Sequence, residues 1–366
     1  MDASTSGLRI VIVGASGNAG TALLRRLHQD GRHELTGVVR RVPQTSAAPY
    51  DGVRWHRCDI GAYGATDRLA AIFDGADAVV NLAWQIQPSH DQRRLHRTNV
   101  GGSRAVVDAA VRAGVPALVV ASSVGVYAPG PKDRRVAESW PHTGVPGSSY
   151  SVHKAAVEAL LDRAEAEHPS LRVVRLRPGL IFQRDAGTEI GRYFLGPLAP
   201  TGLLRFGRIP LVPSDPALRV QAVHADDVAD AYARAITADV RGAFNIAADP
   251  VLTPQVAAAL FHGRAVGVPG GLLRVAAGVT WRLRLQPVDS GWVRLALNAP
   301  LMSCERAATE LGWRPRTDAA TALRELVDGM ATHAHTDAPP LSDAATMAGR
   351  PGGLLRGHLP GTGDPY

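Results

Sequence analysis

The stretch Leu8-Arg9-Ile10-Val11-Ile12-Val13-Gly14-Ala15-Ser16-Gly17-Asn18-Ala19-Gly20 decides the fold of this chain. Its first six residues are an apolar, β-branched run, which predicts a short buried strand. Glycines then recur at every third position, and a helix pattern covers residues 21–29. In such a unit the backbone can approach a pyrophosphate closely, and the N–H groups and dipole at the helix start stabilise its charge. The stretch therefore predicts the first β-α unit of a dinucleotide-binding domain.

Apolar runs and helix patterns continue to alternate after this unit. We expect strands at residues 35–39, 52–60, 77–84 and 117–121, and helices at residues 67–73, 99–113 and around Tyr150. This alternation is typical of an α/β fold with a doubly wound parallel (Rossmann) sheet.

The later sequence predicts a second, smaller unit. We expect residues 1–180 to form the Rossmann domain and residues 223–250 to return to it. Residues 181–222 and 251–334 should form a smaller, mainly helical C-terminal substrate lobe. Residues 335–366 should form a flexible Gly/Pro-rich tail. Ligands should bind at the carboxyl ends of the sheet strands, facing that lobe.

Lysine is rare in this chain, and its position is informative. Only Lys132 and Lys154 are present, and Lys154 lies four residues after Tyr150. On a helix these two positions share a face, so we expect the ammonium to approach the phenol and lower its pKa from the usual ~10. Ser122 and Ser123 follow a predicted strand, so a serine hydroxyl should face the same carbonyl. We predict Tyr150, Lys154 and one of these serines as catalytic residues.

Two arginines end the second predicted strand. Arg40 and Arg41 stand where a site for NAD usually has an acid that binds the ribose hydroxyls. A guanidinium pair suits a 2′-phosphate through charge-assisted hydrogen bonds. The sequence therefore favours NADP(H) as cofactor, with NAD(H) as the alternative.

Several further motifs resemble those of the extended short-chain dehydrogenase/reductase superfamily, the NAD-dependent epimerase/dehydratase group, over about residues 8–330. Besides the glycine loop and the Tyr150/Lys154 pair, they are Asn81-Leu82-Ala83, Thr98-Asn99-Val100-Gly101-Gly102, Ser123-Val124-Gly125-Val126-Tyr127, Arg177-Pro178-Gly179, Val223-His224-Ala225-Asp226-Asp227-Val228-Ala229 and Leu311-Gly312-Trp313-Arg314-Pro315. The resemblance implies an NAD(P)-dependent enzyme, and it implies Ser123, more than Ser122, as the catalytic serine beside Tyr150 and Lys154.

The residues and the resemblance together predict a site. The expected cofactor-binding residues are Gly14, Ser16, Gly17, Asn18, Ala19, Gly20, Arg40, Arg41, Asp59, Ile60, Leu82, Ala83, Trp84, Asn99, Ala121, Ser122, Tyr150, Lys154, Arg177, Pro178 and Gly179. The expected substrate-binding residues are Trp84, Gln85, Ser123, Val124, Phe182 and Phe194.

Departures from the family pattern guide the choice of reaction. Trp84 follows Asn81-Leu82-Ala83 where sugar-processing members commonly have alanine, and Arg219 is one position out of register with an arginine that binds a nucleotide-sugar diphosphate. We therefore expect an NADP(H)-dependent oxidoreductase that transfers hydride between nicotinamide and a carbonyl or secondary alcohol of a small, partly apolar metabolite, with Tyr150 as general acid/base. The alternatives are a nucleotide-sugar epimerase or dehydratase with tightly bound NAD(P), and a non-catalytic dinucleotide sensor, which would not need the catalytic set.

Composition argues against other classes of function. The formal net charge of +7 comes from scattered arginines, which does not favour nucleic-acid binding. The thirteen histidines include no helical metal-binding pattern, so we expect no metal site. Cys58 and Cys304 are far apart, and no apolar run reaches membrane-spanning length. We expect a cytoplasmic homodimer with a small-molecule substrate and neither nucleic-acid nor membrane partners.

Overall fold

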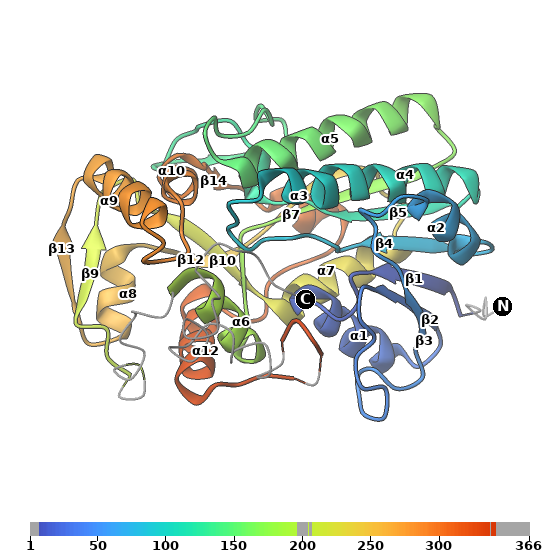
Figure 1. The fold of residues 1–366 in the computed structure, drawn as a ribbon, viewed down its shortest axis with the longest axis horizontal. Helices are drawn as coiled ribbons and strands as arrows, with labels where there is room; N and C mark the ends of the chain where they lie inside the picture. Colours follow the sequence, from blue (N-terminus) through green and yellow to red (C-terminus); the bar gives the residue numbers. More distant parts are fainter. Residues whose placement is uncertain (1–6, 196–203, 205–206, 337, 342–366) are drawn as a thin grey trace.

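The computed structural model describes residues 7–195, 204, 207–336 and 338–341. Within them, a central seven-stranded sheet has the order β11-β7-β5-β4-β1-β2-β3, and all its neighbouring strands are parallel (Figure 1). The strands are β1 (Arg9–Val13), β2 (Glu34–Val39), β3 (Arg54–Arg57), β4 (Ala78–Asn81), β5 (Ala117–Ala121), β7 (Arg172–Pro178) and β11 (Gly242–Ile246). The predicted doubly wound parallel sheet is confirmed.

Helices cover both faces of this sheet. The first face carries α1 (Asn18–Asp30) and α7 (Ala225–Thr237), and the second carries α2 (Ala65–Phe73), α4 (Gly102–Arg112) and α5 (Ser149–Glu167) (Figure 1). Successive side chains of a strand point to opposite faces. Accordingly, Ile10 and Ile12 of β1 join the core under α1 and α7, whereas Val11 and Val13 join the core under the other three helices.

The helical run expected at residues 99–113 begins earlier than predicted and contains a π-helical turn. A short helix, α3 (Gln92–His96), continues into a π-helical turn, η1 (Arg97–Gly101), and α4 starts only at Gly102. The side chain at Gly102 has to be absent, because a Cβ there would lie 2.5 Å from the Ile60 side chain. The π-helical turn therefore leads into α4, whose first residue packs closely against Ile60 after β3.

The C-terminal lobe is mainly helical, as expected. Its helices are α8 (Pro254–Leu260), α9 (Gly270–Arg282), α10 (Ser290–Asn298), α11 (Glu305–Glu310) and α12 (Ala319–Thr332). In Figure 1 this lobe lies at the end of the molecule opposite the N-terminus. Helix α8 starts at Thr253, whose hydroxyl accepts the N–H of Val256, and Pro254 occupies the first turn, where a missing N–H costs nothing.

Three small sheets complete the described structure. They are β12 (Ala248–Leu252)–β10 (Val220–His224)–β8 (Leu180–Phe182), β13 (Arg264–Gly267)–β9 (Leu211–Ser214) and β14 (Leu301–Met302)–β6 (Arg135–Val136). Three short turns, η2 (Val124–Val126), η3 (Arg184–Ala186) and η4 (Gly191–Leu195), and the short helix α6 (Gly187–Ile190) fill the connections. Residues 223–250 supply α7 and the edge strand β11 of the central sheet.

Some predicted segments lie outside the described residues. They are residues 1–6, residues 196–203 and 205–206 of the expected substrate lobe, and residues 337 and 342–366 of the expected tail. The described start of that tail packs on the Rossmann domain: the Thr336 and Tyr50 hydroxyls are hydrogen-bonded at 3.2 Å, and Ala338 and Leu341 are fully buried. Among the described helices, none has the length and apolar character needed to span a bilayer.

Candidate active site

Almost every predicted site residue lines one pocket of about 560 Å³. The pocket runs along the carboxyl ends of β1, β2, β4 and β5 and reaches α10 of the C-terminal lobe. This is where an open parallel sheet binds its ligands. Two predicted cofactor residues, Asn99 and Arg177, are not among the described lining residues.

The glycine loop forms the start of the pocket. Gly14 has a φ of +87°, and a Cβ there would lie 2.8 Å from the Ala83 nitrogen, so only glycine fits between β1 and the end of β4. A Cβ at Gly20 would lie 2.6 Å from the carbonyl carbon of Ala15, so this glycine allows α1 to pack closely on the loop. Helix α1 has no side-chain cap at Gly17 and no acid in its first turn. Its N-terminal N–H groups therefore suit a pyrophosphate.

Charged residues follow the next two strands. Arg40 and Arg41 come directly after β2, are partly exposed and line the pocket. Asp59 and Ile60 line it after β3, and the Asp59 carboxylate accepts the N–H of Gly61 at 2.9 Å. The arginine pair is thus placed beside the expected adenosine end of a dinucleotide.

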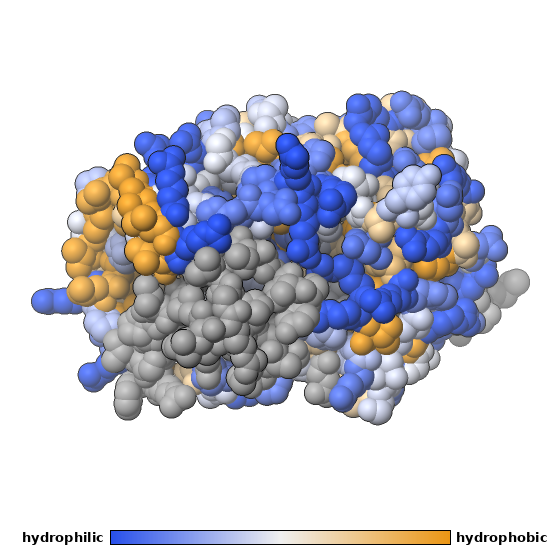
Figure 2. Space-filling model, in the orientation of Figure 1, coloured by the Kyte–Doolittle hydropathy of each residue, from blue (hydrophilic) through white to orange (hydrophobic). Residues whose placement is uncertain are grey.

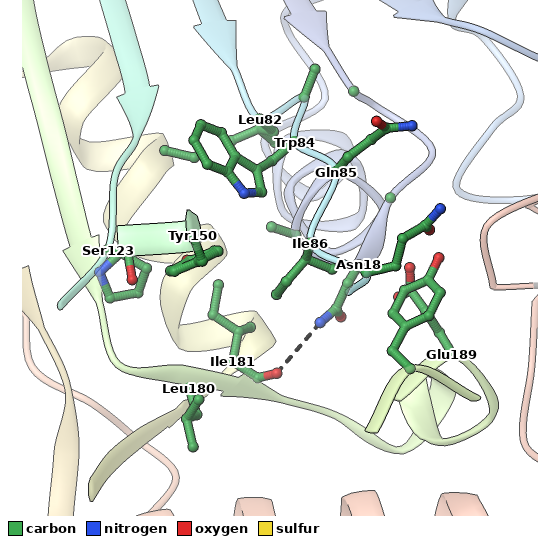
Figure 3. A pocket seen from close by; sticks show the side chains of 18 of the residues that line it. Asn18, Leu82, Trp84, Gln85, Ile86, Ser123, Tyr150, Leu180, Ile181 and Glu189 are labelled. Carbon is green, nitrogen blue, oxygen red and sulfur yellow. Dashed lines mark hydrogen bonds between the residues drawn. The ribbon is translucent and has the colours of Figure 1, made fainter. Parts of the chain in front are cut away.

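Two hydroxyls converge further along the pocket (Figure 3). Ser123 follows β5 and its Oγ accepts the N–H of Gly125 at 3.0 Å, while Tyr150 lies in the first turn of α5. The Ser123 and Tyr150 side chains lie next to each other (Figure 3), and Ser123 opposes the rise in the pKa of the Tyr150 phenol. Gly125 lies under the Tyr150 ring, because a Cβ at this glycine would be 2.8 Å from Cε1. This arrangement allows Ser123 and Tyr150 to meet one substrate oxygen.

Lys154 is not placed as expected. Its Nζ donates to the Ala121 carbonyl at 2.7 Å and lies 3.7 Å from the ring centroid of Trp84, but 6.0 Å from that of Tyr150. Burial raises the pKa of Tyr150 to about 12, opposed only by the Ser123 hydrogen bond. The expected lowering of this pKa by Lys154 is thus absent in this structure, because the end of β5 and the Trp84 ring hold the ammonium instead. Burial also lowers the pKa of Lys154 to about 7, although Glu158 opposes it.

Arg177 is buried behind the pocket rather than in it. Its Nη2 donates to Glu158 Oε2 at 2.6 Å, its Nε donates to Oε1 at 2.8 Å, and its Nη1 donates to the Tyr127 hydroxyl at 3.0 Å. A buried guanidinium needs such a carboxylate partner. Glu158 also accepts the Ser122 hydroxyl at 2.5 Å, so this network ties α5 and β7 to the pocket wall. Arg177 therefore supports the wall and does not line the cofactor site.

Asn99 also acts from behind the wall. Its Oδ1 accepts the N–H of Gln85 at 2.8 Å, and its Nδ2 donates to the Gln85 carbonyl at 3.0 Å. These paired bonds replace a missing strand partner for residue 85, whose side chain lines the pocket. The predicted role at the cofactor is corrected to positioning of Gln85.

Comparison with known proteins agrees with this geometry. The pattern of the NAD dependent epimerase/dehydratase family matches residues 10–247, from β1 to the end of the sheet. The chain belongs to this family. It is an NAD(P)-dependent enzyme of the extended short-chain dehydrogenase/reductase type.

Individual family members show how varied its reactions are. The chain is 29% identical to L-arabinose 1-dehydrogenase (NAD(P)(+)) of Haloferax volcanii over 50% of this chain and 70% of that protein. It is 28% identical to dTDP-glucose 4,6-dehydratase of Streptomyces antibioticus over 88% and 92% of the two chains. Sterol-4-alpha-carboxylate 3-dehydrogenase ERG26 of Saccharomyces cerevisiae is 29% identical, but the match covers only 47% of this chain and 51% of that protein.

A solved structure shares the fold. The UDP-glucose 4-epimerase of Thermus thermophilus, determined with NAD, superposes with a TM-score of 0.64 at 20% identity, covering 88% of this chain and 99% of that one. At this identity the similarity supports the fold and not the reaction.

An aromatic cluster distinguishes the substrate end of this family member. Trp292 of α10 has its ring centroid 4.8 Å from that of Tyr150, Phe194 lies 5.1 Å from Trp292 at a right-angled contact, and Trp84 meets Tyr150 edge-on at 5.9 Å. The predicted Phe182 lines the pocket nearby. Trp292 was missed from the sequence because it stands in a helix far along the chain with no motif around it.

Two cations at this end were also missed as site residues. Lys132 and Arg219 line the pocket. The Lys132 Nζ donates to the carbonyls of Arg219 at 2.9 Å and Ala296 at 2.8 Å, and burial lowers its pKa to about 8. Both lysines of the chain therefore contribute to the same pocket.

Proposed function

We propose that this enzyme is an NADP(H)-dependent oxidoreductase that transfers hydride between nicotinamide and a carbonyl or secondary alcohol of a small, partly apolar metabolite. The observation that carries the proposal is the pairing of the Ser123 and Tyr150 hydroxyls with an aromatic wall made by Trp84, Phe194 and Trp292. Such a wall favours an apolar substrate body, and the two hydroxyls supply the polar contact that orients its oxygen.

Arg40 and Arg41 support the choice of NADP(H). They stand at the end of β2, where the ribose of the adenosine is expected, and the acids among the described lining residues are Asp59 and Glu189 only. Neither acid follows β2. A guanidinium pair at this place suits the 2′-phosphate of NADP(H).

In the proposed reaction, each residue around the substrate oxygen has its own role. When bound, the nicotinamide supplies or accepts the hydride. Tyr150 donates the proton to the oxygen in the reducing direction, and its raised pKa keeps the phenol protonated at neutral pH. Ser123 donates a hydrogen bond to the same oxygen. Lys154 uses one N–H for the Ala121 carbonyl, which leaves two donors for a ribose hydroxyl.

A nucleotide-sugar epimerase or dehydratase with tightly bound NAD(P) is the second candidate. Lys132 and Arg219 favour it, because these cations at the substrate end could bind a diphosphate. The match to a dTDP-glucose 4,6-dehydratase over 88% of this chain adds support.

The test is a fluorescence titration of the purified protein with NADPH and with NADH, after checking it for retained nucleotide. NADPH binding at least ~10-fold tighter, about 1.4 kcal/mol, is expected. Retained NAD, or equal or tighter binding of NADH, would reject the reductase proposal and favour the epimerase or dehydratase.

A further inference from the structure

Large exposed hydrophobic side chains concentrate on one part of the C-terminal lobe. The described part of the chain has eleven such residues. Four of them are scattered, namely Val42, Tyr63, Val152 and Leu180. The other seven belong to β9, β13, α9 and the turn after α9, and they are Leu211, Val266, Leu272, Val275, Val279, Leu283 and Leu285. We call these seven residues the α9 face. Figure 2 shows a continuous hydrophobic area over these elements.

Helix α9 presents its apolar stripe outward. Leu272, Val275, Val279 and Leu283 recur every three or four residues, so they share one side of the helix, and they are 49–63% exposed. Within α9 only Gly270 is buried. An apolar stripe normally faces a core, and a contiguous exposed patch of this kind indicates a binding surface.

Arginine dominates the charge of the segment that carries most of the α9 face. Residues 250–288, which include six of the seven residues of the face, contain no aspartate or glutamate, in a chain that has 33 acids. The same segment contains Arg264, Arg274, Arg282 and Arg284, all exposed. Outside the segment, the Asp215 carboxylate lies at the start of α9, where it accepts a backbone N–H at 2.7 Å. Apolar residues among these arginines are complementary to an anionic lipid surface, where the arginines meet phosphates and the apolar side chains enter the interface.

The α9 face is also close to the substrate end of the pocket. Helix α10 packs against α9 and contributes Trp292, Leu295 and Ala296 to the pocket wall. The Trp281 ring of α9 stacks on His90 with centroids 4.0 Å apart, which anchors the helix to the loop that follows the wall residue Gln87. A partner bound to the α9 face would therefore be separated from the bound substrate by helix α10.

We propose that the α9 face binds the surface of a lipid bilayer that contains anionic lipids. This contact is peripheral and needs no spanning helix, and it replaces the expectation that no membrane takes part. The arginines give the attraction to anionic headgroups, and the apolar side chains hold the lobe in the interface.

Co-sedimentation of the full chain with vesicles tests this proposal. We expect the partition coefficient to be at least ~10-fold higher for vesicles of phosphatidylcholine with phosphatidylglycerol than for phosphatidylcholine alone, given about a 5-fold gain for each arginine at the surface. The double variant Leu272→Glu/Val279→Glu should lose at least ~10-fold. The matched control Tyr63→Glu/Val152→Glu adds the same charges at exposed apolar positions elsewhere and should lose much less. Melting temperatures of both variants, equal to the wild type, verify folding.

Three results would overturn the proposal. One is no binding to either vesicle, and another is an equal loss in the control variant. The third is a wild-type oligomer that Leu272→Glu/Val279→Glu converts to monomers without any vesicle binding by the wild type, which would show that a second copy covers the α9 face.

Discussion

The nucleotide end of the pocket is made mainly from backbone, whereas its substrate end is made from large side chains. At the nucleotide end, the absence of a side chain at Gly14 lets β1 approach the chain at Ala83, and its absence at Gly20 lets α1 pack closely on the loop at Ala15. At the second end, Trp84, Tyr150 and Trp292 contact one another across three segments. The difference teaches that cofactor binding and substrate binding should be separable by mutation.

Glu158 lies behind the pocket wall and pairs with a buried guanidinium, so its loss should have the largest effect. Glu158→Gln leaves Arg177 without its carboxylate partner and should lower the free energy of unfolding by about 3–5 kcal/mol. Glu167→Gln, at an exposed position of the same helix, should cost less than about 0.5 kcal/mol. Urea unfolding measures both.

The pH dependence sharpens this prediction. Burial alone would raise the pKa of Glu158, but the Arg177 contacts and the Ser122 hydrogen bond lower it to about 2. A carboxylate with a lowered pKa adds stability above its unfolded pKa of ~4.3, and this stability is lost as the pH falls toward 2. The difference between wild type and Glu158→Gln should therefore shrink between pH 5 and pH 2, and a constant difference would contradict the assignment.

Tyr150→Phe should break the chemistry at the substrate end and spare the nucleotide end. Removal of the proton donor should lower kcat at least ~10²-fold, with NADPH affinity nearly unchanged. Tyr232→Phe is the matched control, because it removes a pocket hydroxyl that has no hydrogen-bond partner in the part of the chain that the structure describes. Steady-state rates with a carbonyl substrate found by screening give the measurement. Full turnover by Tyr150→Phe would remove it from the mechanism.

The arginine pair tests the nucleotide end alone. Arg40→Gln/Arg41→Gln should weaken NADPH binding at least ~10-fold, about 1.4 kcal/mol, and leave NADH binding unchanged. Arg282→Gln/Arg284→Gln makes the same charge change in the C-terminal lobe and should affect neither cofactor. Equal weakening of NADPH and NADH by the first pair would show a general role instead of 2′-phosphate recognition.

Trp292→Leu should have the smallest effect and report on the substrate wall. Loss of its contacts with Tyr150 and Phe194 should raise KM by roughly 3- to 10-fold, in keeping with about 0.5–1.5 kcal/mol for an aromatic pair. NADPH affinity should not change. Trp281→Leu, in the same lobe but outside the described pocket lining, is the control. A KM unaffected by Trp292→Leu would place the substrate elsewhere in the pocket.

Most of the fold could be predicted because its signals are local. The β-branched runs, the glycine spacing and the helix patterns depend on neighbours within a few residues. They located β1, β2, β4 and β5 to within a few residues and identified the turn from β1 to α1. The helical run that ends in α4 starts at Gln92, before the predicted residue 99, and no local pattern indicated the π-helical turn within it.

The sequence by itself determined the parallel sheet, the dinucleotide loop, the arginine pair after β2 and the placement of Ser123 near Tyr150. Only the tertiary structure decided whether a polar side chain lines the pocket or is buried behind the pocket wall. Lys154 contacts the Ala121 carbonyl and the Trp84 ring, and Arg177 pairs with Glu158. Trp292, which lies in a helix far along the chain, packs on Tyr150. The physical reason is that a buried charge goes to the partner that best compensates its desolvation, and that partner is chosen by packing between segments that no local pattern connects.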